Sequence, residues 1–119
     1  MEKQLTVLVV DDEAMVRLLA KTFLDEADFN TLLASNADEA IEVLERRDDI
    51  HAIITDVQMP GSMDGVRLAH AVSKRWPPIA IIVVSGQWWE PHILPEKSRF
   101  FRKPFHPKEI INAVHELVN

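Results

Sequence analysis

The chain of 119 residues contains no cysteine, which excludes disulfide-rich scaffolds, zinc sites built on thiolates and enzymes with a cysteine nucleophile. It also lacks a long hydrophobic run. The longest purely apolar stretch covers residues 79–84, whereas a membrane-spanning helix needs roughly 18 residues. The first apolar run, residues 5–10, leads into three acidic residues and is not a signal peptide. These absences predict a cytoplasmic protein that has no membrane partner.

Positive charge is scarce as well. Thirteen lysines and arginines stand against nineteen aspartates and glutamates, so the net charge is −6. Because binding to nucleic acid needs a basic face, we expect no direct contact with nucleic acid. The hydrophobic content of 47% is ordinary for a globular protein, and a chain of this length suits one hydrophobic core. Residues 1–119 are therefore predicted to form a single domain.

Apolar runs rich in β-branched residues alternate with amphipathic segments along the chain. The runs predict five strands, at residues 5–10, 30–34, 51–55, 79–84 and 98–102. Apolar residues at helical spacing predict helices at residues 14–27 and 65–75. Two further helices are expected, one capped by Asn36 with Glu39 at a capping-box spacing, and a last one that starts at Pro107.

Such alternation is typical of a parallel sheet with helices on both faces, joined by right-handed crossovers. We therefore predict an α/β, flavodoxin-like, doubly wound fold with five parallel strands in the order 2-1-3-4-5. One segment departs from the pattern. Little room for a full fourth helix exists between Ser85 and Ser98, and Pro91 and Pro95 interrupt it. A shortened or irregular fourth helix, or a loop, is expected there.

Polar residues follow the strands at the edge where this fold binds ligands. Asp11 and Asp12 follow the first strand, and Asp56 follows the third. Ser85 follows the fourth strand and Lys103 follows the fifth. Gathered carboxylates resist ionisation without a counter-charge, which Mg²⁺, a cation that prefers oxygen ligands, supplies. Since a carboxylate can attack phosphorus and a lysine can neutralise the phosphoryl oxygens, this set is sufficient to accept a phosphoryl group.

Each of these residues also has an ordinary structural interpretation. Asp12 alone is often a helix cap, and Asp56 before a turn is more often a turn former than a nucleophile. Ser85 lies in an ordinary strand-exit turn, and Lys103 alone would usually be a solvated surface charge. Their joint placement after four different strands is what favours a chemical role.

Four segments indicate a family. They are VLVVDDE at 7–13, TDVQMPGSMDG at 55–65, VVSG at 83–86 and FRKPF at 101–105. In this order and at this spacing, over essentially the whole chain, the sequence resembles the receiver domain of two-component response regulators, of the kind found in chemotaxis regulators. The resemblance implies that the chain is no enzyme beyond its own aspartyl phosphorylation and dephosphorylation.

The resemblance also assigns roles to single residues. It implies that Asp56 is the phosphoacceptor, and that Asp11, Asp12, Asp56 and the backbone carbonyl of Gln58 hold Mg²⁺. Ser85 corresponds to the switch hydroxyl and Lys103 to the lysine that contacts the phosphoryl group. The Lys103–Pro104 peptide bond is expected to be cis.

The implied partners are a histidine kinase or a histidine phosphotransfer protein as phosphodonor, an unknown downstream protein, and a second copy in a homodimer. Phe100 stands in the place of the family's switch aromatic and is either that switch or a core residue. Trp88 and Trp89 form either a docking patch or a cover over the gap left by the short helix. The resemblance implies that Gln58 and Gln87 flank the attacking water and affect the lifetime of the phosphoryl group, in an unspecified direction.

Two other classes stay open. One is a degenerate receiver that works as a phosphate-independent protein-binding module, which the unusual segment 86–97 favours and the intact set of site residues opposes. The other is a small Mg²⁺-dependent phosphohydrolase with Asp56 or Asp11 as nucleophile, although the chain has no segment to spare for a substrate-enclosing cap. With no output domain after Asn119, we expect either a stand-alone regulator or a receiver cut from a longer protein.

Overall fold

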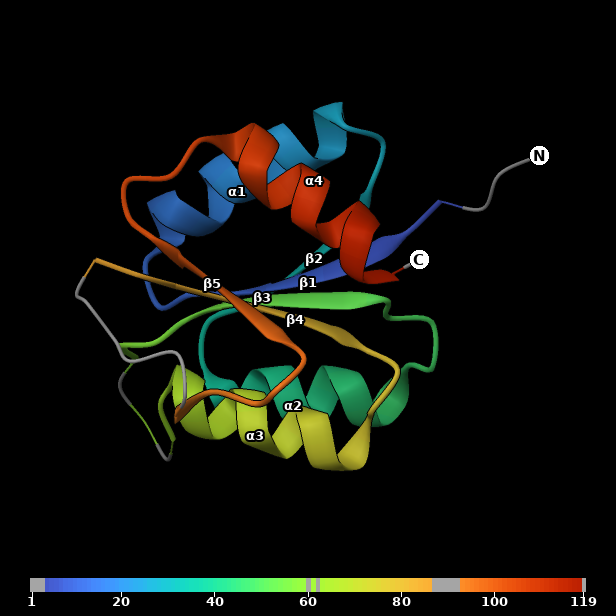
Figure 1. The fold of residues 1–119 in the computed structure, drawn as a ribbon, viewed down its shortest axis with the longest axis vertical. Coiled ribbons are helices and arrows are strands. Elements are labelled where there is room, and N and C mark those ends of the chain that lie inside the picture. Colours follow the sequence, from blue (N-terminus) through green and yellow to red (C-terminus); the bar gives the residue numbers. More distant parts are fainter. Residues whose placement is uncertain (1–3, 60, 62, 87–92, 119) are drawn as a thin grey trace.

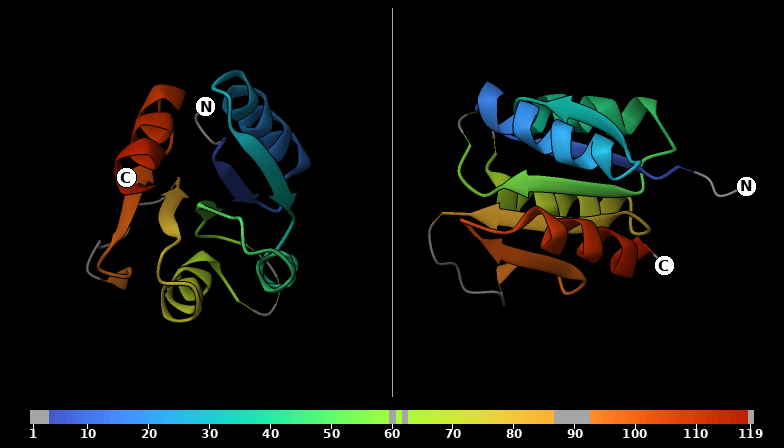
Figure 2. Two further views of the ribbon diagram at one scale, coloured as in Figure 1. Left: turned by 90° about the vertical axis from the view of Figure 1, so that its right-hand side faces the viewer. Right: turned by 90° about the horizontal axis from the view of Figure 1, so that it is seen from above.

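The structure is a computed structural model, and it describes residues 4–59, 61, 63–86 and 93–118. Its centre is a five-stranded sheet in the order β2-β1-β3-β4-β5, with every neighbouring pair parallel. Two helices, α1 and α4, cover one face of the sheet, and α2 and α3 cover the other (Figure 1). Figure 2 shows the same three layers from two further directions. The predicted fold class and strand order are therefore confirmed.

The strands are β1 (Thr6–Val10), β2 (Asn30–Ala34), β3 (Ala52–Asp56), β4 (Ala80–Ser85) and β5 (Ser98–Arg102). The helices are α1 (Ala14–Glu26), α2 (Ala37–Arg46), α3 (Gly65–Arg75) and α4 (Pro107–Val118). None of the helices within the described residues is long and apolar enough to cross a membrane.

The central strands are buried on both faces, which explains their nearly continuous apolar runs. Along β1, Leu8 packs into the layer of α2 and α3, whereas its neighbours Val7 and Val9 pack into the layer of α1 and α4. The same alternation places Ile53 of β3 and Ile54 of β3 in opposite layers. Both faces of the sheet are thus closed by apolar contacts, and polar side chains are left to the ends of the strands.

The connection from β4 to β5 was expected to hold a short or irregular helix. Residues 87–92 lie outside the described part of the chain, and residues 86 and 93–97 form no α-helix. Leu94 is buried in the layer of α2 and α3, and the carbonyl oxygen of Ile93 lies 2.6 Å from Nε2 of His70 on α3. The described part of this connection is therefore fastened to α3.

Helix α2 begins as the sequence indicated. The side chain of Asn36 accepts a hydrogen bond from the backbone N–H of Glu39 at 2.8 Å, and the Glu39 carboxylate accepts one from the N–H of Ser35. The pair resembles a capping box, except that Glu39 accepts from the residue before the cap and not from the cap itself, and the bond from Ser35 lowers the pKa of Glu39. Helix α3 is capped by Asp64, whose carboxylate accepts from the N–H of Arg67.

Candidate functional site

Three of the residues predicted for the site meet at the carboxyl edge of the sheet. Strands β1 and β3 are neighbours, with Val10 paired to Thr55, so the chain delivers Asp11 and Asp56 side by side. Lys103 follows β5 and reaches across to them. Its Nζ lies 2.7 Å from Oδ2 of Asp56 and 3.9 Å from Oδ2 of Asp11. One ammonium group therefore lies beside two carboxylates and offsets only one of their two negative charges.

Burial sets the ionisation of Asp11, which is only 3% exposed. Burial raises the pKa of Asp11, and the negative charges of Asp56 and Asp12 raise it further. The backbone N–H of Glu13, 2.9 Å from its Oδ1, and the charge of Lys103 act in the opposite direction without cancelling the rise. The ionised carboxylates of Asp11, Asp12 and Asp56 thus repel one another, and a further cation would weaken this repulsion.

The same carboxylate charges stabilise the protonated form of Lys103. Burial by itself lowers the pKa of Lys103, but the hydrogen bond to Asp56 and the charges of Asp56, Asp11 and Glu13 outweigh burial and raise it. The side chain is therefore a firmly protonated ammonium in the site.

The backbone fixes the direction of the Asp56 carboxylate. The N–H of Gln58 donates to Oδ1 of Asp56 at 3.1 Å, and the N–H of Val57 donates to the carbonyl of Val84 at 3.0 Å. Since Lys103 occupies Oδ2, the two carboxylate oxygens have different partners. These two partners hold the Asp56 carboxylate in one orientation.

The other predicted site residues, Ser85, Asp12 and Gln58, lie at the same edge of the sheet. Ser85 ends β4 and is 1% exposed, and its carbonyl oxygen accepts a 2.8 Å bond from the N–H of Lys103. This bond ties the exits of β4 and β5 together. The side chains of Asp12 and Gln58 are exposed to solvent.

Two residues at the site were missed by the sequence analysis. Arg17 on α1 donates from Nη1 to the carbonyl oxygen of Asp11 at 2.7 Å, which holds the exit of β1. Gly65 lies so close to Asp56 that a Cβ atom on Gly65 would be 1.9 Å from the carbonyl oxygen of Asp56. The only signal for Gly65 was a glycine directly after a helix-capping aspartate, and Arg17 had none because a backbone carbonyl leaves no mark in the sequence.

An apolar hollow of about 600 Å³ adjoins the site between α1 and the start of α4. Its lining is almost wholly apolar, and Lys103 forms part of it. The main apolar residues are Val16, Leu19, Phe23, Pro104 and Phe105. Next to it α1 exposes large apolar side chains, with Met15 66%, Leu18 56% and Leu19 61% exposed. Soluble surfaces that gather such side chains often contact other proteins.

Comparison with known proteins identifies the family to which this arrangement belongs. Residues 7–115 match the family described as response regulator receiver domain. The chain belongs to this family. It is 37% identical to the hydrogenase transcriptional regulatory protein HoxA of Cupriavidus necator, over 98% of this chain and 25% of HoxA. It is 36% identical to a putative NtrX-like response regulator of Rickettsia felis, over 70% of this chain and 18% of that protein. The receiver domain thus spans a quarter or less of these curated relatives.

Solved structures agree with this assignment. A response regulator receiver protein from Sinorhizobium medicae superimposes with a TM-score of 0.91 at 28% identity, covering 98% of this chain and 96% of that one. The response regulator TrrA from Thermotoga maritima, solved in complex with Mg²⁺ and BeF, matches with a TM-score of 0.83 at 25% identity, covering 96% and 99%. The receiver domain of the hybrid histidine kinase CckA matches with a TM-score of 0.81 at 26% identity, covering 96% and 99%.

The donor atoms of this receiver domain suit Mg²⁺. Within the described residues, no three histidine, cysteine, aspartate or glutamate side chains come together as ligands of one ion. Mg²⁺, however, commonly takes only one or two carboxylates and keeps several waters. Asp11 and Asp56 supply hard carboxylate oxygens. Burial and then the charge of Asp56 raise the pKa of Asp11, and a divalent cation would relieve the repulsion between the two carboxylates. The donor set therefore fits the ion.

Three remaining expectations concern the surroundings of the site. The Lys103–Pro104 bond is cis, as expected. Phe100 is half-buried against the layer of α2 and α3, a position that fits either a core residue or a switch. Gln87, Trp88 and Trp89 lie outside the described residues, so the expectations about them stay predictions.

Proposed function

We propose that residues 1–119 act as one receiver domain that accepts a phosphoryl group on Asp56. The donor is a phosphohistidine on a histidine kinase or a histidine phosphotransfer protein. The observation that carries this proposal is the 2.7 Å contact between Lys103 Nζ and Asp56 Oδ2, with Asp11 3.9 Å from the same ammonium. A surface lysine has no need to bridge two carboxylates at the end of a sheet, whereas phosphoryl transfer requires a fixed cation beside the nucleophile.

The transfer exchanges one bond for another at phosphorus. A carboxylate oxygen of Asp56 forms a P–O bond while the P–N bond to the donor histidine breaks, and the ring nitrogen keeps the electron pair. Asp56 loses its charge on becoming an acyl phosphate, so the ammonium of Lys103 transfers its bond to the phosphoryl oxygens. Asp11, Asp12, Asp56 and the carbonyl of Gln58 would hold Mg²⁺, which would supply further positive charge to the transfer.

The phosphoryl group changes the exits of two strands. Its new acceptor oxygens attract the Lys103 ammonium and the Ser85 hydroxyl. The bond from the N–H of Lys103 to the carbonyl of Ser85 couples the two exits, so they shift together. The result is a population shift between two arrangements of the chain at the ends of β4 and β5. A downstream protein recognises one of these two arrangements.

The donor docks on the exposed apolar face of α1, which is defined by Met15, Leu18 and Leu19. A donor protein must bring its phosphohistidine to Asp56 and so must cover the surface around the site. The apolar hollow that includes Lys103 runs from the site to this face. A donor helix with an apolar stripe fits such a surface.

Intact mass spectrometry tests the acceptor assignment. The protein is incubated with acetyl phosphate, with and without Mg²⁺, as wild type, Asp56→Asn and, as a matched control on α1, Asp25→Asn. We expect a single phosphoryl adduct that needs Mg²⁺ and that the Asp56 variant alone has lost. Adduct formation on Asp56→Asn would contradict the site. Turnover of acetyl phosphate in large excess over protein would indicate a phosphohydrolase instead.

A second measurement tests the docking face. Leu19→Arg is compared with Leu33→Arg, which changes an exposed leucine on β2 outside the α1 face. With a purified phosphorylated histidine phosphotransfer protein as donor, Leu19→Arg should slow transfer about tenfold or more, because it places a charge in the apolar contact. With acetyl phosphate as donor, both variants should react like the wild type. Equal rates for both variants with the protein donor would exclude α1 as the docking face.

A further inference from the structure

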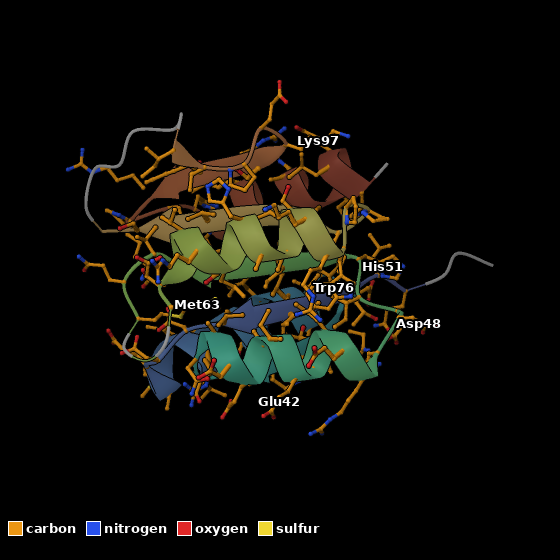
Figure 3. The ribbon with its side chains drawn as sticks, turned by 90° about the horizontal axis from the view of Figure 1, so that it is seen from below. Glu42, Asp48, His51, Met63, Trp76 and Lys97 are labelled. Carbon is orange, nitrogen blue, oxygen red and sulfur yellow. The ribbon has the colours of Figure 1, made fainter. Side chains whose placement is uncertain are left out.

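Helices α2 and α3 lie side by side on the face of the sheet opposite α1 and α4, and their outer surfaces carry opposite charges. Figure 3 looks onto this face, with Glu42 labelled on α2. Helix α2 exposes the acidic residues Asp38, Glu42 and Glu45 and one basic residue at its end, Arg46, which lies 3.8 Å from Glu42. Helix α3 contains no acidic residue and exposes Arg67 and Lys74, followed by Arg75 at its end.

The opposite charges on the two helices also lie at the same heights along the helix axes. Both helices run antiparallel to the parallel strands and so point in the same direction. The contact of 2.7 Å between Arg75 Nη2 and Glu45 Oε2 shows that their last turns lie at the same level. Asp38 and Glu45 are two helical turns apart, and so are Arg67 and Lys74. Asp38 is therefore level with Arg67, and Glu45 is level with Lys74.

Two copies of the chain placed face to face can bring these opposite charges together. A two-fold axis parallel to the helices puts α2 of each copy opposite α3 of the other and preserves both direction and level. Asp38 then faces Arg67 of the second copy, and Glu45 faces its Lys74. A two-fold axis across the helices would instead place α2 on α2, acid against acid. Only the first arrangement is complementary, and it is isologous, as closed dimers require.

We propose that two copies of this chain associate through the surface formed by α2 and α3, which we call the bipolar face (Asp38, Glu42, Glu45, Arg67 and Lys74). This association goes beyond the proposed phosphoacceptor function, because it uses no residue of the Asp56 site.

Ionic strength distinguishes the ion pairs between two bipolar faces from the overall repulsion between two chains of net charge −6. At about 0.1 M salt the screening length is about 10 Å, so repulsion across the whole molecule is weakened while charges in contact still attract. At about 1 M salt the screening length is about 3 Å, and the contacts are weakened too. Exposed ion pairs are individually weak, so we expect a weak dimer that dissociates at high salt.

Sedimentation velocity on the intact chain, at protein concentrations up to about 1 mM, tests the proposal. The acidic pair is reversed in one variant (Asp38→Lys with Glu45→Lys), and the basic pair in another (Arg67→Glu with Lys74→Glu). Each variant alone should be monomeric, since positions 38 and 45 of one copy then face like charges at positions 67 and 74 of the other. An equimolar mixture should dimerise like the wild type, because each reversed helix then faces a complementary one. A chain that carries all four changes should also dimerise.

A matched control changes the net charge without touching the bipolar face. Glu26→Lys with Glu109→Lys alters exposed residues of α1 and α4 and should leave the dimer intact. Restoration in the mixture also shows that both reversed variants are folded. A wild type that stays monomeric at about 1 mM in about 0.1 M salt would overturn the proposal. So would a dimer that survives either charge reversal, or a mixture that remains monomeric.

Discussion

Gly65 packs directly against the backbone of Asp56, because a Cβ atom on Gly65 would lie 1.9 Å from the Asp56 carbonyl oxygen and 2.9 Å from the Cα of Val57. The N–H of Gly65 also donates to the carbonyl of Val57 at 2.8 Å. The start of α3 and the residue that we propose to carry the phosphoryl group therefore share one rigid contact. A side chain cannot be added to one without displacing the other.

Replacement of Gly65 by alanine should destabilise the protein by about 3 kcal/mol, since the new methyl group meets backbone atoms that cannot rotate away. The displaced Asp56 should also accept phosphate from acetyl phosphate more slowly. Gly86→Ala is the control, because a Cβ atom there meets nothing within 4 Å. Urea unfolding and the rate of adduct formation measure the two effects. A Gly65→Ala protein as stable as Gly86→Ala would contradict the close contact.

Replacement of Lys103 by methionine should have opposite effects on metal binding and on chemistry. The ammonium at 2.7 Å from Asp56 competes with Mg²⁺ for the same carboxylates, so its removal should strengthen Mg²⁺ binding. Without that cation beside the phosphoryl oxygens, adduct formation should slow by about 100-fold or more. Calorimetric titration with Mg²⁺ and intact mass measure these changes. Lys21→Met, which breaks a surface ion pair on α1, should change neither.

Replacement of Asp11 by asparagine should stabilise the protein near neutral pH in the absence of Mg²⁺. Burial and the neighbouring carboxylates raise the pKa of Asp11 above its ordinary value of 3.8, so the ionised form is less stable in the folded chain than in the unfolded one. This penalty is present above the raised pKa and disappears below 3.8, where both states hold the proton. Asparagine avoids the penalty and keeps the oxygen that accepts from the N–H of Glu13.

Thermal unfolding as a function of pH checks this effect. The excess melting temperature of Asp11→Asn should shrink as the pH falls through the raised pKa of Asp11 and vanish in the acid range. Added Mg²⁺ should stabilise the wild type more than the variant, because the variant has lost a carboxylate ligand. A variant that is less stable than the wild type at every pH would show that ionised Asp11 contributes favourably to the fold.

Replacement of Arg17 by alanine should cost about 1.5 kcal/mol of stability, because a charged donor is lost from the carbonyl of Asp11 in a half-buried position. Adduct formation should slow as well, since that bond holds the exit of β1. The control is Lys21→Ala one turn further along α1, where an exposed pair with Asp25 is worth about 0.5 kcal/mol or less. Urea unfolding measures both losses of stability. Equal losses in the two variants would show that Arg17 contributes no more to stability than an exposed ion pair does.

Most of the fold followed from periodicity and handedness. The bounds of β2, α3 and β5 match the predicted residues, and the predicted strand order is the observed one. Strands β3 and β4 begin and end one residue later than predicted, because the backbones of Asp56 and Ser85 still pair, with Val84 and Arg102. A polar side chain at a strand end says little about where backbone pairing stops, so the sequence placed those ends one residue too early.

The candidate site was predictable where it depended on topology and not where it depended on close packing. The meeting of Asp11, Asp56 and Lys103 follows from parallel strands that end at one edge of the sheet. The roles of Arg17 and Gly65 depend on backbone atoms of other residues, which are the same in every sequence. The matched charges of α2 and α3 likewise become visible only once the two helices are known to lie side by side.

The wide spacing of the site residues along the chain ties function to completed folding. Asp56 and Lys103 are 47 positions apart, and the cluster comes together only when β1, β3, β4 and β5 have all taken their places. A nascent or partly unfolded copy therefore presents isolated carboxylates and a free amine in place of an acceptor. Under the proposed function, phosphorylation is therefore confined to copies whose sheet is fully assembled.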